Sequence, residues 1–225
     1  MANRIQVLSE ELANKIAAGE VVERPASVVK ELVENALDAE STRIFVHMKA
    51  GGTQVISVDD NGIGMNAEDA VLALHRHATS KIRDIIDLDA LQTMGFRGEA
   101  LPSIGAVSQL ELATREEGSI SGTRVVVQGG KVTEVGEIGR AVGTTVTVKQ
   151  LYYNTPARRK FLRSAYTELR HSTRTIIQCA IAHPEIGFTL HHNERELFHW
   201  SKTESLKLRL QDIYGPQLLK EALPL

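Results

Sequence analysis

The sequence predicts an α+β fold in which a mixed, largely antiparallel sheet is layered with helices. Short β-rich runs between residues 108 and 148 alternate with Gly and Thr turns, as in an antiparallel meander. Longer segments with helical spacing lie before and after that stretch, so helices and strands do not alternate as in repeated βαβ units. We therefore expect an antiparallel sheet with helices on one face.

Composition bounds the class of protein before any motif is considered. The 225 residues are 42% hydrophobic and 24% charged, with a net charge of -2, which are ordinary values for a soluble globular protein. This balance gives no global argument for a nucleic-acid or membrane partner. The chain has no run of about 18 apolar residues and no apolar signal segment at its start, so we expect a cytoplasmic protein, nucleoid-associated if bacterial. The single Cys179 excludes an intrachain disulfide and a multi-cysteine zinc site.

The spacing of apolar residues and the positions of proline and glycine predict the helices and strands before residue 76. Apolar residues recur three and four apart in two early segments, and Pro25 suits the first turn of the second one. Side chains alternate in the next two runs, which Gly51-Gly52 joins as in a hairpin. The predicted elements are a helix over residues 9–22, a helix over 25–38, strands over 43–49 and 54–59, and a helix over 66–75.

The same rules predict the elements after Gly98. They are a helical turn, strands over residues 110–112, 123–127, 132–135 and 144–148, a basic helix over 156–182, a hairpin over 188–200 and a helix within 206–213. Gly215-Pro216 closes the last helix. We expect residues 1–202 to form one domain and residues 203–225 to begin a second, although a terminal helix docked on the first domain is the alternative.

The polar face of the predicted helix over 25–38 is the most informative stretch of the chain. Glu31, Glu34, Asn35 and Asp38 lie three and four apart, opposite an apolar stripe. A carboxylate and a carboxamide one turn apart suit a general base and a metal ligand on one face, here Glu31 and Asn35. The alternative interpretation is a solvated polar face without chemistry.

Two glycine loops supply further candidate residues. Asp60 ends a strand, and its carboxylate suits an exocyclic amine, while Gly62 and Gly64 would let a flat base approach the backbone. The loop over residues 95–101 precedes a helix start, and residues 76–81 add two hydroxyls and a cation, a combination that suits phosphate. Each loop alone is equally a glycine-punctuated turn. Patterns for a P-loop, a Rossmann dinucleotide site and an EF-hand are absent.

Taken in order, these residues resemble a known family. The four motifs of the GHKL ATPase superfamily, which has the Bergerat ATP-binding fold, match Glu31-x-x-x-Asn35, Asp60-x-Gly62-x-Gly64, Gly95-Phe96-Arg97-Gly98-Glu99-Ala100-Leu101 and Gly143-Thr144. Within that group, the strings at residues 17–25, 77–81, 95–101 and 153–161 look specifically like the MutL family of DNA mismatch repair proteins. The resemblance runs from about residue 5 to residue 200.

The resemblance implies a role for each matching position. Glu31 would activate the attacking water, and Asn35 would hold Mg²⁺ at the phosphates. Asp60 would bond the adenine amine with help from Thr144. The other implied ATP-binding residues are Gly62, Gly64, Thr79, Ser80, Lys81, Gly95, Phe96, Arg97, Gly98, Glu99, Ala100 and Leu101. Of these, residues 79–81 and 97–101 would form a lid over the triphosphate.

The resemblance also implies a slow Mg²⁺-dependent ATPase that works as a conformational and dimerisation switch in DNA mismatch repair. Its implied partners are ATP, a second copy of the chain, weakly bound DNA, a MutS-like mismatch recognition protein and a downstream nuclease or helicase, with no membrane. Family members contribute a lysine from a second domain, so we expect weak hydrolysis by this length of chain. The alternatives are another GHKL ATPase, of topoisomerase or chaperone type, and a nucleotide-gated binding module with little turnover.

One local patch suits nucleic acid. Its cations lie in a stretch with a single acid, Glu168, and they are Arg158, Arg159, Lys160, Arg163, Arg170 and Arg174. They suit non-specific binding to DNA phosphates with steep salt dependence. The alternative is a solvated helix face with Phe161 and Leu162 packed inward. The histidines at 191, 192 and 199 have no acid or thiol partner at ligand spacing, so we expect no metal there.

Overall fold

A single eight-stranded sheet forms the centre of the computed structural model, which describes residues 7–81 and 98–217. The strand order is β5-β4-β3-β6-β2-β1-β7-β8, and every neighbouring pair is antiparallel except β1 and β7. The predicted fold class, a mixed and largely antiparallel sheet layered with helices, is confirmed.

The observed elements match most of the predicted ones within a few residues. The strands are β1 (Arg43–Lys49), β2 (Val55–Asp60), β3 (Gln109–Arg115), β4 (Gly122–Gln128), β5 (Lys131–Ile138), β6 (Gly143–Lys149), β7 (Gly187–His192) and β8 (Arg195–Trp200). The helices are α1 (Glu10–Val21), α2 (Pro25–Asp38), α3 (Ala67–Leu72), α5 (Ala100–Ala106), α6 (Pro156–Phe161), α7 (Ala165–Ala182) and α8 (Leu206–Tyr214), with a 3₁₀ turn η1 (Ala50–Gly52) between β1 and β2.

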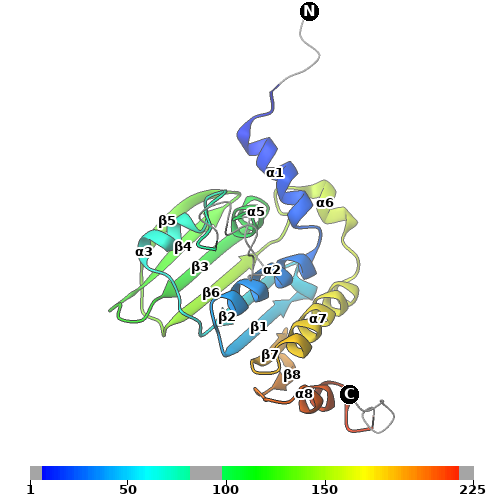
Figure 1. Ribbon diagram of the computed structural model, residues 1–225. Coiled ribbons are helices and arrows are strands. Elements are labelled where there is room, and N and C mark those ends of the chain that lie inside the picture. The colour runs from blue at the N-terminus through cyan, green and yellow to red at the C-terminus, as the bar shows by residue number, and fades with distance from the viewer. Residues whose placement is uncertain (1–6, 82–97, 218–225) are drawn as a thin grey trace, which may run out of the picture.

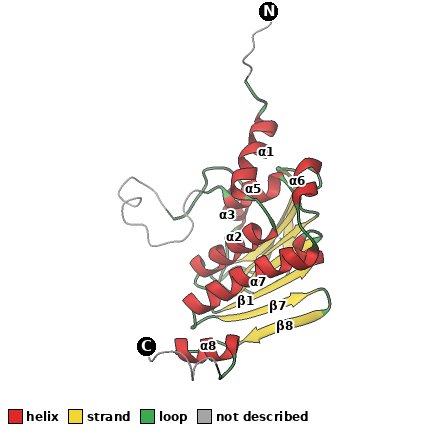
Figure 2. Ribbon diagram, turned by 90° about the vertical axis from the view of Figure 1, so that its right-hand side faces the viewer, coloured by secondary structure: helices red, strands yellow, loops and turns green. Residues whose placement is uncertain are grey.

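Helices α2 and α7 cover one face of the sheet and leave the other face open (Figures 1 and 2). Successive side chains of a strand point to opposite faces of the sheet. In β1, Ile44 and Val46 point to the covered face and are fully buried, whereas Phe45 between them is not. The buried stripe of α2 packs on the same core through Val29 and Val33, and each such side chain contributes roughly 1.5–3 kcal/mol. This packing turns the polar stripe of α2 away from the sheet.

The basic stretch over residues 156–182 is two helices, so the prediction of one continuous helix was wrong. Helix α6 ends at Phe161, and Leu162 is extended. Ser164 then caps α7 by accepting a hydrogen bond from the Thr167 backbone N–H at 3.3 Å, and Glu168 accepts one from the Arg163 N–H at 2.9 Å. These side chains satisfy the free amides of a new helix start and so favour a break.

Helix α8 is tied to the β7–β8 edge of the sheet by one buried residue. Arg209 is fully buried, and its Nη2 donates to the carbonyl oxygens of Pro184, Ile186 and Ser201 at 2.7–2.9 Å. Arg209 therefore attaches α8 to the segments that flank β7 and β8, and the expected domain boundary at residue 202 stays a prediction. No helix within residues 7–81 and 98–217 has the length and apolar content needed to cross a membrane.

Candidate functional site

The polar stripe of α2 forms one wall of the candidate site. Glu31 and Asn35 are both partly buried, one turn apart. Burial raises the pKa of Glu31 above its ordinary value, and the positive charge of Lys30 partly opposes this. A carboxylate with a raised pKa is a better proton acceptor, so the environment of Glu31 suits a general base.

Asp60 lies at the end of β2, on the face that α2 covers. It is 7% exposed, and its Oδ1 accepts hydrogen bonds from the backbone N–H of Gly62 at 2.8 Å and of Thr144 at 3.2 Å. Burial raises the Asp60 pKa to about 6, against the lowering effect of these two hydrogen bonds. Within the described part of the chain Oδ2 accepts no hydrogen bond, so this oxygen is available to a ligand donor such as an amine.

Strand register explains why Thr144 stands beside Asp60. The antiparallel pairing of β2 with β6 sets these two residues opposite each other, and the pairing of β6 with β3 sets Thr144 opposite Thr114. The two threonine hydroxyls are 2.9 Å apart, and Thr114 also accepts a hydrogen bond from the Met65 N–H at 2.9 Å. Sequence reasoning missed Thr114, because nothing in an alternating strand distinguishes it from the other threonines.

The turn after Asp60 joins this corner of the sheet to the end of α2. The Ile63 N–H donates to the Ala39 carbonyl oxygen at 2.9 Å. A Cβ on Gly62 would lie 2.4 Å from the same oxygen, and one on Gly64, where φ is +70°, would lie 2.0 Å from the Arg115 carbonyl oxygen. Both glycines are therefore required by the packing of the chain on itself, and a role in admitting a flat base stays a prediction.

Two loop segments, residues 76–81 and 98–101, are fastened to each other. The His77 N–H donates to the Gly98 carbonyl oxygen at 3.2 Å, and a Cβ on Gly98 would lie 2.4 Å from the Ala78 carbonyl oxygen. Glu99 forms an ion pair with Arg76 at 2.8 Å, and its Oε1 lies 2.9 Å from His77 Nδ1, so this predicted ATP-binding side chain holds the two segments together.

The structure describes only some of the other predicted ATP-binding residues of these loops. The Thr79 hydroxyl accepts a hydrogen bond from the Lys81 N–H at 3.2 Å, and Ser80 is exposed. Ala100 and Leu101 form the first turn of α5. The predicted residues Gly95, Phe96 and Arg97 lie outside the described residues.

Lys81 connects the loop segments to α2. Its Nζ is 3.2 Å from Asn35 Oδ1 and 2.5 Å from Asp38 Oδ2. The amide oxygen predicted to hold Mg²⁺ thus accepts a hydrogen bond from an ammonium group, and its role as a metal ligand stays a prediction. No group of three or more His, Cys, Asp or Glu within the described residues can hold a metal alone. A Mg²⁺ ion at Asn35 would therefore need phosphate and water oxygens, which is its usual way of binding.

The basic segment does not act as one surface. Arg158 Nη1 lies 3.4 Å from the Val22 carbonyl oxygen, which also accepts a 2.7 Å hydrogen bond from the Tyr152 hydroxyl. A Cβ on Gly19 would lie 1.4 Å from the Arg158 guanidinium. Arg158 is therefore packed against the C-terminal end of α1, where a cation also suits the helix dipole.

The rest of the basic segment is on the surface. The exposed cations are Arg159, Lys160, Arg163, Arg170 and Arg174. Phe161 is 83% exposed, so the interpretation that packs it inward is wrong, whereas Leu162 is partly buried against the core as expected. The prediction that these cations contact DNA stays a prediction.

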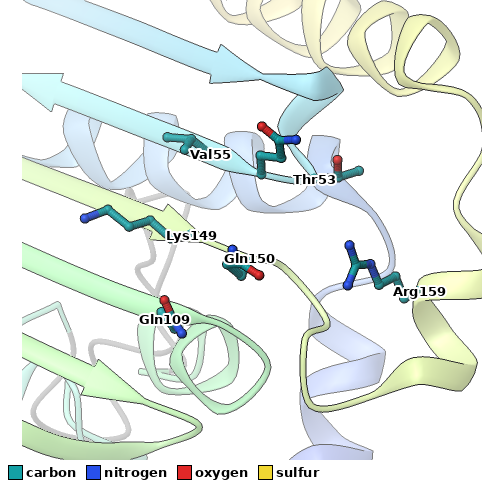
Figure 3. Close-up of a pocket in the computed structure, with 7 residues that line it drawn as sticks. Thr53, Val55, Gln109, Lys149, Gln150 and Arg159 are labelled. Carbon is teal, nitrogen blue, oxygen red and sulfur yellow. The ribbon is translucent and has the colours of Figure 1, made fainter.

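Arg159 borders a hollow of about 310 Å³ (Figure 3). Its lining residues come from the η1–β2 junction, the start of β3, the end of β6 and helix α6, and they are Thr53, Gln54, Val55, Gln109, Lys149, Gln150 and Arg159. Val55 and Asp60 are opposite ends of β2, so this hollow is separate from the Asp60 corner. Lys149 lies 3.7 Å from Glu111, while Arg159 forms no ion pair with a described residue.

Comparisons with known proteins show which family the chain resembles. Residues 23–138 match the family model described as histidine kinase-, DNA gyrase B-, and HSP90-like ATPase. The DNA mismatch repair protein MutL of Trichlorobacter lovleyi is 59% identical over 197 residues, which are 88% of this chain and 33% of that protein. The protein of the same name from Acidobacterium capsulatum is 51% identical over 99% of this chain and 33% of its own length. The chain thus spans about a third of these curated relatives.

Solved structures similar to this chain include a MutL ATPase domain and a DNA repair protein. The Aquifex aeolicus MutL ATPase domain complexed with ADP is 34% identical, with a TM-score of 0.71, and the match covers 86% of this chain and 70% of that one. A structure described as the N-terminal domain of a DNA repair protein has a TM-score of 0.78 at 26% identity, over 91% of this chain and 60% of that one.

Proposed function

The chain belongs to the MutL family of DNA mismatch repair proteins, and on that premise we propose that it binds Mg·ATP between α2 and the Asp60–Thr144 corner and hydrolyses it. The observation that carries the proposal is the geometry of Asp60. One oxygen of this buried carboxylate is fixed by two backbone N–H groups, and the other is left for a ligand. An adenine amine is a donor of the right kind.

Each residue of the site has a definite task in this proposal. Asp60 accepts the adenine amine, and Thr144, held by Thr114, supports that contact. Glu31 accepts the proton of the attacking water, which its raised pKa favours. Asn35 would hold the metal, and bound Mg²⁺ would neutralise charge on the phosphates. Thr79, Ser80 and Lys81, together with the fastened segment 98–101, contact the triphosphate.

We further propose that the nucleotide acts as a switch. The Lys81 side chain connects the loop segment over residues 76–81 to α2, so a ligand at this junction can bias the arrangement of the loop. ATP-dependent pairing of two copies, contacts with a mismatch recognition protein and signalling to a nuclease or helicase all belong to this proposal. These activities concern the whole protein, and this chain matches only about a third of the length of its relatives.

Calorimetry with two nucleotides tests the adenine contact. We expect wild type to bind Mg·ATP and to bind Mg·GTP at least about tenfold more weakly, because the guanine carbonyl oxygen cannot donate to Asp60. Asp60→Asn should lose most of this preference. Thr145→Val, which alters the neighbouring threonine on the open face of β6, should keep it. Equal binding of both nucleotides by wild type would contradict the proposal.

A second function, weak nucleic-acid binding, is favoured by Arg159 and its surroundings. Arg159 has no ion-pair partner among the described residues, and the hollow beside it adds Lys149 and three glutamines. Phe161 on the same helix exposes an aromatic face on which a base can stack. Binding of a single-stranded oligonucleotide should fall steeply with salt, and Arg159→Gln should reduce the slope of log K against log salt by about one unit. An unchanged slope would contradict this second proposal.

A further inference from the structure

We propose that the ammonium of Lys81 takes the Asn35 oxygen that Mg²⁺ would use, and that binding of Mg·nucleotide displaces Lys81 from α2 to the phosphates. This exchange of one cation for another rests on the proposed function, because it takes Asn35 as the residue that holds the metal. It assigns a role to Asp38, a residue that the ATP-binding motifs leave without one.

The contacts of Lys81 support the proposal. Its Nζ lies 3.2 Å from Asn35 Oδ1 and 2.5 Å from Asp38 Oδ2. The side chains of Lys81 and Asp38 are only 19% and 10% exposed, so water screens this pair weakly. A divalent cation at the same amide oxygen would stand close to the ammonium, and two cations repel each other strongly in a poorly screened place. Asn35 can therefore serve one of them at a time.

The loop that carries Lys81 has an attachment other than the Lys81 side chain. Gly98 and Glu99 fasten residues 76–78 of this loop to the segment at the start of α5. A lysine has a long flexible stem and an ammonium that changes partners without a fixed orientation. The phosphate oxygens of a bound nucleotide would replace those that Lys81 gives up at Asn35 and Asp38.

Asp38 is the anchor of the nucleotide-free arrangement. It is the last residue of α2, and the carbonyl oxygen of the next residue, Ala39, holds the turn that follows Asp60. A carboxylate here is unfavourable for a nearby triphosphate, yet it is well placed to hold Lys81. The pair therefore favours the protein without nucleotide and lowers the affinity for Mg·nucleotide.

A double-mutant cycle measured with Mg·ADP tests the exchange. We expect Asp38→Asn to bind Mg·ADP about two- to tenfold more tightly than wild type in calorimetry, because Lys81 no longer has to leave an ion pair. Removing the charge of Asp38 also reduces repulsion of the phosphates, so the decisive comparison is made in a Lys81→Met background. The exchange predicts that Asp38→Asn then gives no gain, whereas repulsion alone predicts an equal or larger one.

A matched control and a second readout complete the experiment. Glu40→Gln removes the same charge from an exposed residue two positions further on and should leave the affinity unchanged. Acetic anhydride should acetylate Lys81 slowly in nucleotide-free wild type and faster in Asp38→Asn, as followed by mass spectrometry. Weaker binding by Asp38→Asn, or a gain that persists without Lys81, would overturn the exchange alone. No binding of Mg·ADP by wild type would overturn the proposed function as well.

Discussion

Asp60 is a buried carboxylate whose local environment works against its charge. Its pKa of about 6 results from burial, which the two backbone hydrogen bonds only partly offset. The sequence made Asp60 a candidate, because a carboxylate followed by two glycines stands at a strand end, and the resemblance to the GHKL motifs supplied its expected role. It was not enough to find Thr114, which becomes a neighbour only through the pairing of β6 with β3.

The free energy of unfolding should depend on pH because the charge of Asp60 is buried. Its pKa is 3.8 ordinarily and about 6 in the fold, so the folded protein binds the extra proton between these values and loses stability as pH rises through that window. Asp60→Asn keeps the acceptor oxygen without the charge. It should be more stable than wild type at pH 7.5, by at most about 2–3 kcal/mol, and the difference should shrink towards pH 4. Urea unfolding at both pH values measures this, and a destabilised variant at pH 7.5 would contradict it.

Replacing Glu31 separates chemistry from binding. Glu31→Ala should lower the rate of ATP hydrolysis by about 10²- to 10⁴-fold, because the base that accepts the water proton is lost. It should leave the dissociation constant of Mg·ADP within about twofold of wild type, since Glu31 makes no contact that binding requires. Glu34→Gln, on the same helix face, is the matched control and should keep most turnover. Equal turnover by wild type and Glu31→Ala would rule out Glu31 as the base.

For the helices and strands, the periodicity of apolar residues predicted nearly every element. It did not predict the break between α6 and α7, which side-chain hydrogen bonds favour. The run over residues 156–182 keeps helical spacing throughout, so spacing alone gave one helix. The break at Leu162 is set by Ser164 and Glu168, which satisfy the amides of the new helix start. Ser164, a residue type that favours the N-cap position, was the signal in the sequence that could have located it.

Adjacent arginines on α6 should behave differently. Arg158 is packed on Gly19 and directed at the Val22 carbonyl oxygen, whereas Arg159 borders the open hollow. Arg158→Gln should therefore lower amide hydrogen-exchange protection at the C-terminal end of α1, by roughly 1 kcal/mol of local opening free energy. Arg159→Gln should leave it unchanged. Equal effects of the two substitutions would contradict the assignment of Arg158 to the support of α1.

Across the whole molecule, the register of one sheet assembles the site from distant parts of the sequence. Asp60 and Thr144 meet through β2 and β6, and the turn after Asp60 reaches the end of α2 through Ala39. The fold class was predictable because helical and alternating patterns occur in separate blocks. The strand order was not, since parallel pairing of β1 with β7 joins segments whose register no local pattern encodes.

Arg209 links α8 to the rest of the molecule, so replacing it tests whether α8 is docked on the sheet domain. Its Nη2 donates to three carbonyl oxygens, of which those of Pro184 and Ile186 precede β7 and that of Ser201 follows β8. Arg209→Ala should cost about 2–4 kcal/mol in the free energy of unfolding, because these acceptors lose their donor. Lys207→Ala, on the exposed side of α8, should stay within about 0.5 kcal/mol of wild type in the same urea titration. Similar values for both would contradict the close docking of α8.

Calorimetric titration of ATP with and without Mg²⁺ tests whether α2 and the Asp60 corner form one Mg·ATP site. We expect Mg²⁺-dependent binding by wild type, binding that survives in Glu31→Ala, and binding at least about tenfold weaker in Asn35→Ala. Absence of ATP binding by wild type, or an Asn35→Ala variant that binds Mg·ATP as tightly as wild type, would contradict it.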